Sequence, residues 1–558
     1  MRGPRNFQID PDEILLDATN LPEFNTQQFE GRIEKALSRR AILFLSIGFI
    51  LIGLGYLYRL GMLQIVHGKE YRIRSEDNSL RLVTVPPERG VIYDRNGELL
   101  AWNDPVGGRR YKDSAGLSHV LGYLGLPTRE ELDDSLVKDP ALKVGKMGVE
   151  RQYDELLRGT IGQKVEEIDS MGNSVSEGIH VTPVAGQAIT LSIDNRLQGA
   201  LYQYIEEIAA ERNFKGGAGL LMDVLNGEVI ALVSFPEFSL ATLSATNTKK
   251  EVLNLLSDKR TPFLNRAVSG VYTPGSVIKP FVALGALSEG TIDPDKEILS
   301  TGSIEIPNPY VPGVVSIFKD WKAHGFVDMR RALAVSSNVY FYEIGGGYMD
   351  QKGLGIENIY KYARLFGFGS ETGIDLAGEQ YGTVPNSEWK KTVFDEPWRL
   401  GDTYHTAIGQ YGFQVTPIQM LRAVSAIANG GKLLTPHILK DYAVNYPGVS
   451  LDEIIPISES NFQIVREGMR LGVLEGTATA ISAGYVKFAG KTGTAELGEE
   501  KKRVNSWIDG YFPYQEPRYA FVVVMENGRA GNTIGASAVA KRFFDWMSIY
   551  TPEYYNLD

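Results

Sequence analysis

An uninterrupted apolar run over residues 41–58 dominates the hydrophobic pattern near the start of the 558-residue chain. As a helix, these eighteen residues would span roughly 27 Å, close to the thickness of the hydrocarbon layer of a membrane. Two tyrosines near the end of the run suit the lipid–water interface, and the following arginine can extend its charge towards the headgroups. We therefore predict one transmembrane helix over residues 41–60, after a polar tail over residues 1–40; a buried core helix is the alternative.

Apolar stretches broken by Asn-Gly pairs predict β-hairpins, because this dipeptide favours the tight turn between two antiparallel strands. One hairpin is expected within residues 83–103 and another within residues 220–234. A third strand pair is expected within residues 518–530, folding back at Asn527-Gly528.

Apolar residues three or four apart predict a helix after Asp194, whose carboxylate is suited to cap it. Strands are expected near both ends of residues 191–550, with helices between them. This order predicts an α/β (α+β) domain in which one antiparallel sheet, built from distant parts of the chain, is flanked by helices. The preceding residues 61–190 are predicted to form a separate, β-rich domain.

The composition limits the possible functions. Hydrophobic residues make up 43% of the chain, enough for a large core, and 558 residues are enough for two or more domains. The net charge of −11 argues against nucleic acid as a main partner, and the absence of cysteine excludes disulfides, thiolate catalysis and cysteine-bound zinc. Asp320 and His324 are only two potential ligands, so no metal site is predicted.

The first candidate for chemistry is Ser276, which follows a Pro-Gly turn and begins an apolar helix expected to reach Leu287. Lys279 lies three residues later, so its amine shares a helix face with the serine hydroxyl. A serine nucleophile with a lysine base requires this pair, and the helix end also offers free N–H groups to an oxyanion. Three further Ser-x-x-Lys sequences begin at Ser135, Ser316 and Ser387. The spacing alone therefore does not separate a site from a solvated pair.

A second candidate piece is Ser336-Ser337-Asn338, which follows a helix predicted over residues 329–335. At such a turn Ser336 could relay a proton, and Asn338 could hold Lys279 and an amide of the substrate. The competing interpretation is an N-cap for the next helix.

A third candidate piece is the predicted strand Lys491-Thr492-Gly493-Thr494. Its glycine suggests that a ligand backbone comes close, as an extended peptide would if it paired with the strand. Lys491 with Thr492 or Thr494 would then bind a terminal carboxylate. As a second cation about 4 Å away, Lys491 would also lower the pKa of Lys279 by about 3 at an effective dielectric constant near 20. One lysine would then be neutral and the other charged, with their individual proton transfers left open.

With these three pieces the chain resembles the class B penicillin-binding proteins of the elongation type (penicillin-binding protein 2), which share S-x-x-K, S-x-N and K-T-G motifs. The resemblance covers nearly everything after about residue 60. Other stretches with counterparts in that family are residues 89–97, 272–276, 401–403, 408–410, 416–419 and 428–431. Near residues 104–110, where relatives carry a longer insertion, the chain is short, and the sequence leaves open whether this is natural.

The resemblance implies a peptidoglycan D,D-transpeptidase anchored in a bacterial cytoplasmic membrane. Residues 1–40 would be cytoplasmic, 61–190 a membrane-proximal pedestal (dimerisation-type) domain, 191–550 an outward-facing transpeptidase domain and 551–558 a short tail. It implies stem peptides derived from lipid II as substrates, β-lactams as inhibitors, a SEDS-family glycosyltransferase as membrane partner, and no cofactor. The orientation rests on the resemblance, because basic residues lie on both sides of the span.

The resemblance also assigns roles within the site. Ser276 would attack the penultimate D-alanine carbonyl of a stem peptide, and the N–H groups of Ser276 and Thr494 would form the oxyanion hole. Two alternatives remain. One is a D,D-carboxypeptidase or β-lactamase of the same superfamily, which uses water as the acceptor. The other is a catalytically idle membrane receptor or activator of a glycosyltransferase.

Overall fold

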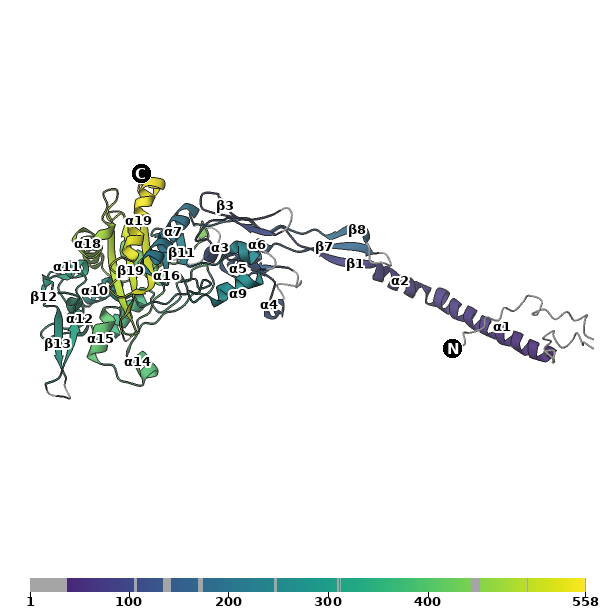
Figure 1. Ribbon diagram of the computed structural model, residues 1–558, viewed down its shortest axis with the longest axis horizontal. Helices are drawn as coiled ribbons and strands as arrows, with labels where there is room; N and C mark the ends of the chain where they lie inside the picture. The colour runs from purple at the N-terminus through teal and green to yellow at the C-terminus, as the bar shows by residue number, and fades with distance from the viewer. Residues whose placement is uncertain are drawn as a thin grey trace, which may run out of the picture. The chain divides into compact units, whose positions relative to one another are not determined.

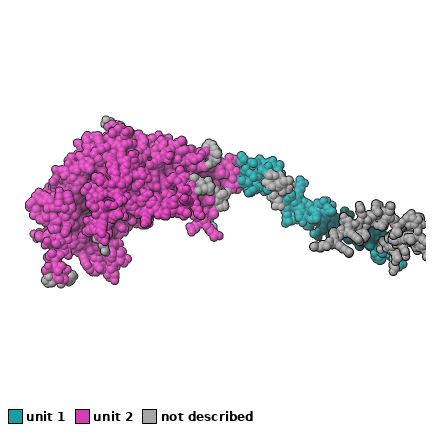
Figure 2. Space-filling model, viewed as in Figure 1, with its two compact units in different colours: residues 1–83, 164–179 teal, residues 84–163, 180–558 magenta. Residues whose placement is uncertain are grey.

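The structure is a computed structural model that describes residues 38–104, 108–133, 142–168, 174–244, 248–308, 311, 313–442, 452–498 and 500–556. The chain divides into two compact units, residues 1–83 with 164–179 and residues 84–163 with 180–558 (Figure 2). Much of the predicted pedestal thus shares a unit with the residues after 191. The predicted tail before residue 38 and the centre of the short stretch near 104–110 lie outside the described residues.

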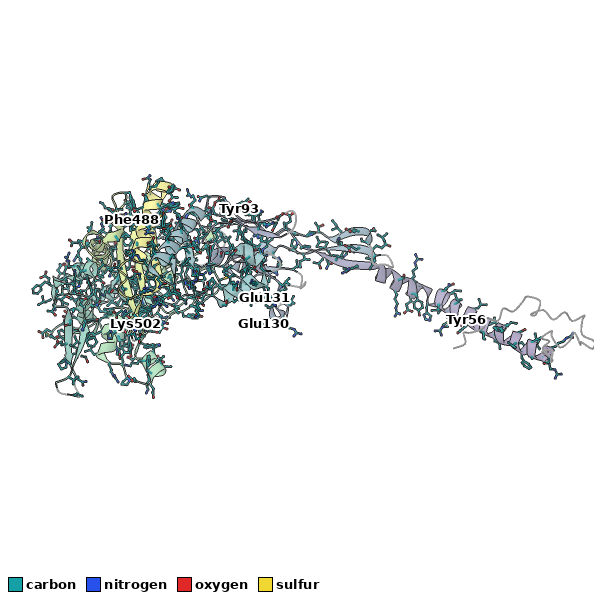
Figure 3. All side chains as sticks on the ribbon, viewed as in Figure 1. Tyr56, Tyr93, Glu130, Glu131, Phe488 and Lys502 are labelled. Atoms are coloured by element: carbon teal, nitrogen blue, oxygen red, sulfur yellow. The ribbon has the colours of Figure 1, made fainter. Side chains whose placement is uncertain are left out.

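The first unit contains the predicted membrane helix, α1 (Arg39–Gly61), which a π-helical turn joins to α2 (Gly68–Ser79). The helical stretch Arg39–Val66 is long and apolar enough to cross a membrane. An 18-residue segment within it has a mean hydropathy of 2.2 and no buried residue. Tyr56 projects freely from this helix (Figure 3). A sheet of order β1-β7-β8 lies mostly in this unit, and one end of each strand belongs to the second unit. Its strands are β1 (Leu80–Val85), β7 (Gly162–Ile168) and β8 (Ser174–Val181).

The second unit begins with a four-stranded sheet of order β4-β3-β2-β9. Its strands are β2 (Ile92–Tyr93), β3 (Leu99–Asn103), β4 (Arg109–Tyr111) and β9 (Ile189–Thr190). Strands β2 and β3 form the predicted hairpin, with Tyr93 opposite Leu99. Short elements follow: α3 (Ser118–Leu121), β5 (Leu124–Gly125), α4 (Arg129–Asp133), β6 (Val144–Gly145), α5 (Gly148–Gln152) and α6 (Asp154–Arg158). A buried carboxylate, Glu150, joins Arg89 and Arg109 at 2.6 and 2.8 Å.

The predicted antiparallel sheet has the order β11-β10-β20-β19-β18, so strands from the two ends of the domain lie side by side. Its strands are β10 (Gly216–Asp223), β11 (Val229–Phe235), β18 (Ala489–Leu497), β19 (Arg503–Phe512) and β20 (Tyr519–Arg529). The predicted hairpin within residues 220–234 is confirmed, with Leu220 opposite Leu232. Strand β18, which carries the Lys-Thr-Gly sequence, lies at one edge of the sheet.

The predicted strand pair within residues 518–530 is wrong, because β20 is one continuous strand through Asn527-Gly528. At this point two residues of β20 lie opposite Asn505 of β19, which is a β-bulge. Asn527 adopts a positive φ of 56°, and its N–H donates to Oδ1 of Asn505 at 3.0 Å. The same dipeptide that makes tight turns therefore makes a bulge here.

Helices cover both faces of this sheet (Figure 1). Helix α7 (Asn195–Arg212), capped by Asp194 as predicted, and α19 (Ala536–Tyr550) cover one face. Helices α10 (Lys279–Ser288) and α16 (Pro417–Ala428) belong to the core on the other face. Strand residues alternate between the two cores, as in Phe521 and Val522, because successive side chains of a strand point to opposite faces.

The remaining elements surround this layered core. They are α8 (Leu240–Ser244), α9 (Lys249–Ser257), β12 (Ile298–Ser300), β13 (Ser303–Pro307), β14 (Val315–Lys319), β15 (Gly325–Val327), α11 (Met329–Val335), α12 (Asn338–Gly346), α13 (Ile356–Leu365), α14 (Ser387–Phe394), α15 (Leu400–Ala407), β16 (Lys432–Leu434), β17 (Asp452–Ile454) and α18 (Glu459–Glu475). After α19, a last turn buries Tyr554, whose hydroxyl donates to Asp194 at 2.9 Å.

Candidate active site

Ser276 lies in a tight turn at the head of a buried helix. Residues Gly275–Ile278 form a 3-10 turn, and α10 continues from Lys279, so the predicted helix is present and its first turn is 3-10. The cause is Pro280, which has no N–H for the Ser276 carbonyl; that carbonyl accepts from the Lys279 N–H instead. Side chains three apart eclipse in a 3-10 turn, so Ser276 and Lys279 still lie on one face.

The Ser276 turn is held by backbone contacts from several elements. The Gly275 N–H donates to the Gly409 carbonyl at 2.9 Å, and Trp507 Nε1 donates to the Thr273 carbonyl at 3.0 Å. A Cβ atom on Gly493 would lie 2.8 Å from the Pro274 carbonyl oxygen. The backbone that comes close to this glycine is therefore the Ser276 turn. The sequence had instead suggested that the backbone of a ligand comes close to Gly493. Gly493 lets the sheet edge pack directly against the turn.

The Ser-Ser-Asn sequence occupies the corner between α11 and α12. Ser336 ends α11 in a left-handed conformation, with a φ of 60°. The N-cap of α12 is Ser337, whose Oγ accepts from the Tyr340 N–H at 3.3 Å. The competing interpretation, an N-cap, is therefore correct for Ser337, the middle residue of the sequence. The side chains of Ser336 and Asn338 do not cap α12 and remain candidates for the site.

Hydrogen bonds join residues of all three motifs around Ser336. Lys279 Nζ donates to the Ser336 carbonyl at 2.8 Å, to Asn338 Oδ1 at 2.7 Å and to Ser336 Oγ at 3.3 Å. Lys491 Nζ donates to Ser336 Oγ at 2.8 Å and to the Thr492 carbonyl at 2.8 Å. The Ser336 hydroxyl therefore lies between two amines, as a proton relay requires.

Lys279 and Lys491 are both buried, and nearby negative charges offset the effect of burial on their pKa values only in part. Burial lowers the pKa of Lys279 well below its ordinary value, and the charge of Lys491 lowers it further, against an opposing effect of Asp320. This confirms the predicted direction, although burial contributes more than the second cation. Burial lowers the pKa of Lys491 to about 7, with Asp509 opposing. The lowered pKa favours the neutral form of the Lys279 amine, which is the form that can accept a proton.

The threonines of β18 differ in their surroundings. Thr492 Oγ1 donates to Thr477 Oγ1 at 2.7 Å, which ties β18 to the segment after α18. Thr494 is exposed. Sequence reasoning missed Thr477, because no recognisable motif surrounds it and only the fold brings it to the site.

Asp320 is a second residue whose role the sequence did not reveal. One oxygen of its carboxylate accepts from the Val339 N–H at 3.0 Å and from the Ser337 hydroxyl at 2.8 Å. It thereby fixes the start of α12, and with it the position of Asn338. The sequence singled it out only as a possible metal ligand beside His324, whose Nε2 lies 3.7 Å from Asp320 Oδ1.

The other Ser-x-x-Lys sequences do not gather at this site. Ser316 is exposed on β14. Ser387 begins α14 and donates to Glu357 at 3.0 Å, while Lys390 binds Asp402 at 2.5 Å. Ser135 lies outside the described residues. Of the described serines compared, Ser276 alone stands in the turn that leads into a lysine of the buried pair.

Comparisons with known proteins agree with this geometry. The penicillin-binding protein transpeptidase domain matches residues 217–546, and the penicillin-binding protein dimerisation domain matches residues 105–191. The peptidoglycan D,D-transpeptidase MrdA of Acinetobacter baumannii is 31% identical over 92% of this chain and 88% of its own length.

Two solved structures are similar over most of the chain. One is PBP2 of Helicobacter pylori in its complex with MreC, with a TM-score of 0.72 and 28% identity over 84% of this chain and 99% of that one. The other comes from a peptidoglycan synthase complex that coordinates polymerization and crosslinking, with a TM-score of 0.71 and 27% identity over 90% and 97% of the two chains.

A serine three residues before a buried lysine, and a hydroxyl that accepts from this lysine and from a second lysine on a sheet edge, are the groups that a serine acyl transferase with a lysine base requires. The chain belongs to the penicillin-binding protein transpeptidase family.

Proposed function

We propose that this protein is a peptidoglycan D,D-transpeptidase that crosslinks stem peptides through an acyl-enzyme on Ser276 during cell-wall elongation. One observation carries the proposal: beside the Ser276 turn, the Ser336 hydroxyl accepts hydrogen bonds from two buried lysines of different motifs. Membership of the family and relatives that are named peptidoglycan D,D-transpeptidases support the same reaction.

In the acylation step, Ser276 Oγ attacks the carbonyl carbon of the penultimate D-alanine, and its proton passes to the neutral amine of Lys279. The N–H groups of Ser276 and Thr494 stabilise the oxyanion. The C–N bond then breaks, and the leaving amine of the last D-alanine receives a proton through the Ser336 hydroxyl. Asn338 keeps the Lys279 amine oriented. An ester on Ser276 remains.

In the second step, an amine of a neighbouring stem peptide attacks this ester. The amine loses a proton to the base, the new amide forms, and Ser276 recovers its hydrogen. A β-lactam opens on the same serine in the first step, and its retained leaving group hinders the second. No cofactor is needed for either step.

We assign the edge of β18 to the binding of the stem peptide. An extended peptide can pair with an exposed strand edge through main-chain hydrogen bonds. Lys491 and the hydroxyls of Thr492 and Thr494 then bind its terminal carboxylate, because an amine and hydroxyls donate to carboxylate oxygens. Gly493 brings this strand close enough to the Ser276 turn for both to contact one substrate.

Two further candidate functions receive less support. A D,D-carboxypeptidase or β-lactamase would use water in place of the amine, but the relatives compared above are named as transpeptidases or belong to a synthase complex. An idle receptor or activator would not need two buried lysines around a serine hydroxyl, an arrangement that costs stability.

We also propose the setting of the enzyme. The protein is anchored in a membrane by α1; we propose that residues 1–40 are cytoplasmic and that the catalytic domain lies outside the cytoplasmic membrane. Residues 61–190 are proposed as the pedestal, and the match of the dimerisation domain to residues 105–191 supports this. The membrane partner that we propose is a SEDS-family glycosyltransferase, and similarity to a chain of a peptidoglycan synthase complex supports it.

The proposed function is tested by labelling the full-length chain with a fluorescent penicillin and mapping the adduct by mass spectrometry. We expect the label on Ser276 and its loss in Ser276→Ala, with Ser387→Ala as the matched control that keeps full labelling. A label on Ser316 or Ser387 would overturn the site. Incubation with a pentapeptide donor and an amine acceptor should then give a crosslinked product in excess over hydrolysis.

A further inference from the structure

Asp509 is a buried carboxylate in the middle of the catalytic sheet that no step of the proposed mechanism uses. It lies on β19, and its residue is fully buried. Neither Oδ1 nor Oδ2 has a hydrogen-bond partner. Buried carboxylates without partners are unfavourable, so such a residue calls for a functional explanation.

The strand register places Asp509 directly opposite Lys491. The two residues face each other across the β18–β19 pair, so their side chains point to the same face of the sheet. Gly493 and Trp507 form the next opposed pair on this face, beside the Ser276 turn. The carboxylate therefore lies on the side of the sheet that carries the site.

The other charged residues near the site change the pKa values of groups other than Lys491. Asp320, before α12, acts on Lys279 of α10. Arg466 and Arg470 of α18 act on Tyr511 of β19. Among the described residues, Asp509 is the carboxylate that raises the pKa of Lys491 against the effect of burial. Burial in turn raises the pKa of Asp509 well above its ordinary value, and the charge of Lys491 lowers it, so each charge favours the other.

We propose that Asp509 is a positioning residue for acylation: its carboxylate faces Lys491 across the strand pair and favours the protonated form of that lysine. A protonated Lys491 serves the reaction in two ways. It holds the carboxylate of the substrate or β-lactam, and its charge keeps Lys279 neutral and ready to accept the proton of Ser276. The inference rests on the proposed function, since it concerns the same reaction.

The effect is purely electrostatic, because no hydrogen bond joins Asp509 to the site. Opposed residues of neighbouring strands are about 5 Å apart at Cβ, so the two side chains share one part of the sheet face. In an interior with an effective dielectric constant near 20, two unit charges about 8 Å apart change a pKa by about 1.5.

The test is the pH profile of the second-order rate constant for acylation by a fluorescent penicillin, measured on the full-length protein in detergent. In the wild type the alkaline limb reports loss of the proton from Lys491. In Asp509→Asn, which removes the charge but keeps the shape, we expect this limb to move to lower pH by about 1 unit or more. Asp509→Val should show the same displacement.

Asp223→Asn is the matched control, because Asp223 is also buried in this sheet but pairs with Arg518 at 2.6 Å, away from the lysines. Its alkaline limb should stay in place, although its melting temperature should fall. Both Asp509 variants should melt no lower than the wild type, since they lose an unpartnered carboxylate.

An unchanged alkaline limb in both Asp509 variants, or a lower melting temperature in both with a uniform loss of rate, would overturn the inference. If the wild type were not acylated at all, the proposed function itself would fail. The two failures are therefore distinguishable.

Discussion

In two Ser-x-x-Lys sequences of the catalytic domain the lysine is buried, and the two lysines have different hydrogen-bond partners. Lys279 is 0% exposed and Lys390 is 2% exposed. Lys279 donates to a carbonyl, an amide and a hydroxyl, and a second amine lies beyond that hydroxyl. Lys390 instead donates to the carboxylate of Asp402.

The difference in partners reverses the sign of the pKa change. Burial lowers the pKa of Lys279, and the cation Lys491 lowers it further. At Lys390 burial also lowers the pKa, but hydrogen bonds with Asp402 and Tyr411 outweigh it, and the pKa is raised. A motif therefore supplies the spacing, while the charge of the partner decides whether the lysine is a base or a structural cation.

Replacing each lysine by methionine should give the largest difference between the two, because one replacement removes a base and the other removes a structural cation. We expect Lys279→Met to slow acylation of Ser276 by about 10³-fold, because the general base is lost. Lys390→Met should keep acylation within about 3-fold but lower stability by about 3 kcal/mol, because Asp402 is left without its partner. Stopped-flow labelling and thermal unfolding measure the two effects. Equal losses of acylation in both variants would contradict the distinction.

The neighbouring serines of the corner give the next largest effect. Ser336→Ala removes the hydroxyl between the two amines and should slow acylation by about 100-fold. Ser337→Ala removes the cap of α12 and should cost about 1 kcal/mol of stability, with a smaller effect on rate. Should Ser337→Ala prove the slower enzyme, the assignment of the relay to Ser336 would be wrong.

The pH dependence of stability should separate the two kinds of lysine. The pKa of Lys491 is about 7 in the folded protein and about 10.4 in the unfolded chain, so the unfolded state binds more protons between these values. Compared with Lys491→Met, the wild type should gain up to about 1.4 kcal/mol of stability per pH unit across that window.

Lys390 should behave in the opposite way. Its raised pKa means that its stabilising effect is fully present below about pH 10.4 and is lost only at higher pH. The difference in melting temperature between wild type and Lys390→Met should therefore be flat from pH 7 to pH 10. A slope of the same sign for both lysines would refute this account.

The smallest expected effect concerns the support of β18. Thr477→Val removes the partner of the Thr492 hydroxyl and should raise the penicillin concentration for half-maximal acylation about 3-fold, with little change in the maximal rate. Thr479→Val, in the turn that follows, is a control without this contact and should match the wild type. A fall in the maximal rate alone would place Thr477 in the chemistry.

Local signals in the sequence predicted much of the fold. The membrane helix, the helix after Asp194 and the hairpin within residues 220–234 follow from patterns a few residues long. The failure at Asn527-Gly528 has a clear reason, since the outcome there depends on the partner strand. Asn505 on β19 accepts a hydrogen bond from the Asn527 N–H. It lies 22 residues earlier in the chain, so the local sequence around Asn527 does not reveal it.

The residues of the site also fall into two groups, those that local sequence motifs predicted and those that only the fold reveals. The three motifs gave Ser276, Lys279, Ser336, Asn338 and Lys491, and hydrogen bonds connect the last four. Asp320, Thr477 and Asp509 were missed, because each acts on a motif residue at least 15 positions away in the chain. Only strand register and helix packing bring such residues to the site.

The central claim is that Lys279 has a pKa well below its ordinary value and accepts the proton of Ser276. The most direct test is the acylation rate constant of the wild type with a fluorescent penicillin, measured from pH 5 to pH 11. We predict that the rate stops rising well below pH 10 and then falls as Lys491 loses its proton, since burial and Lys491 depress the pKa of this base. A rate that rises about tenfold per pH unit until about pH 10 would contradict the claim, because it would report a lysine with an ordinary pKa.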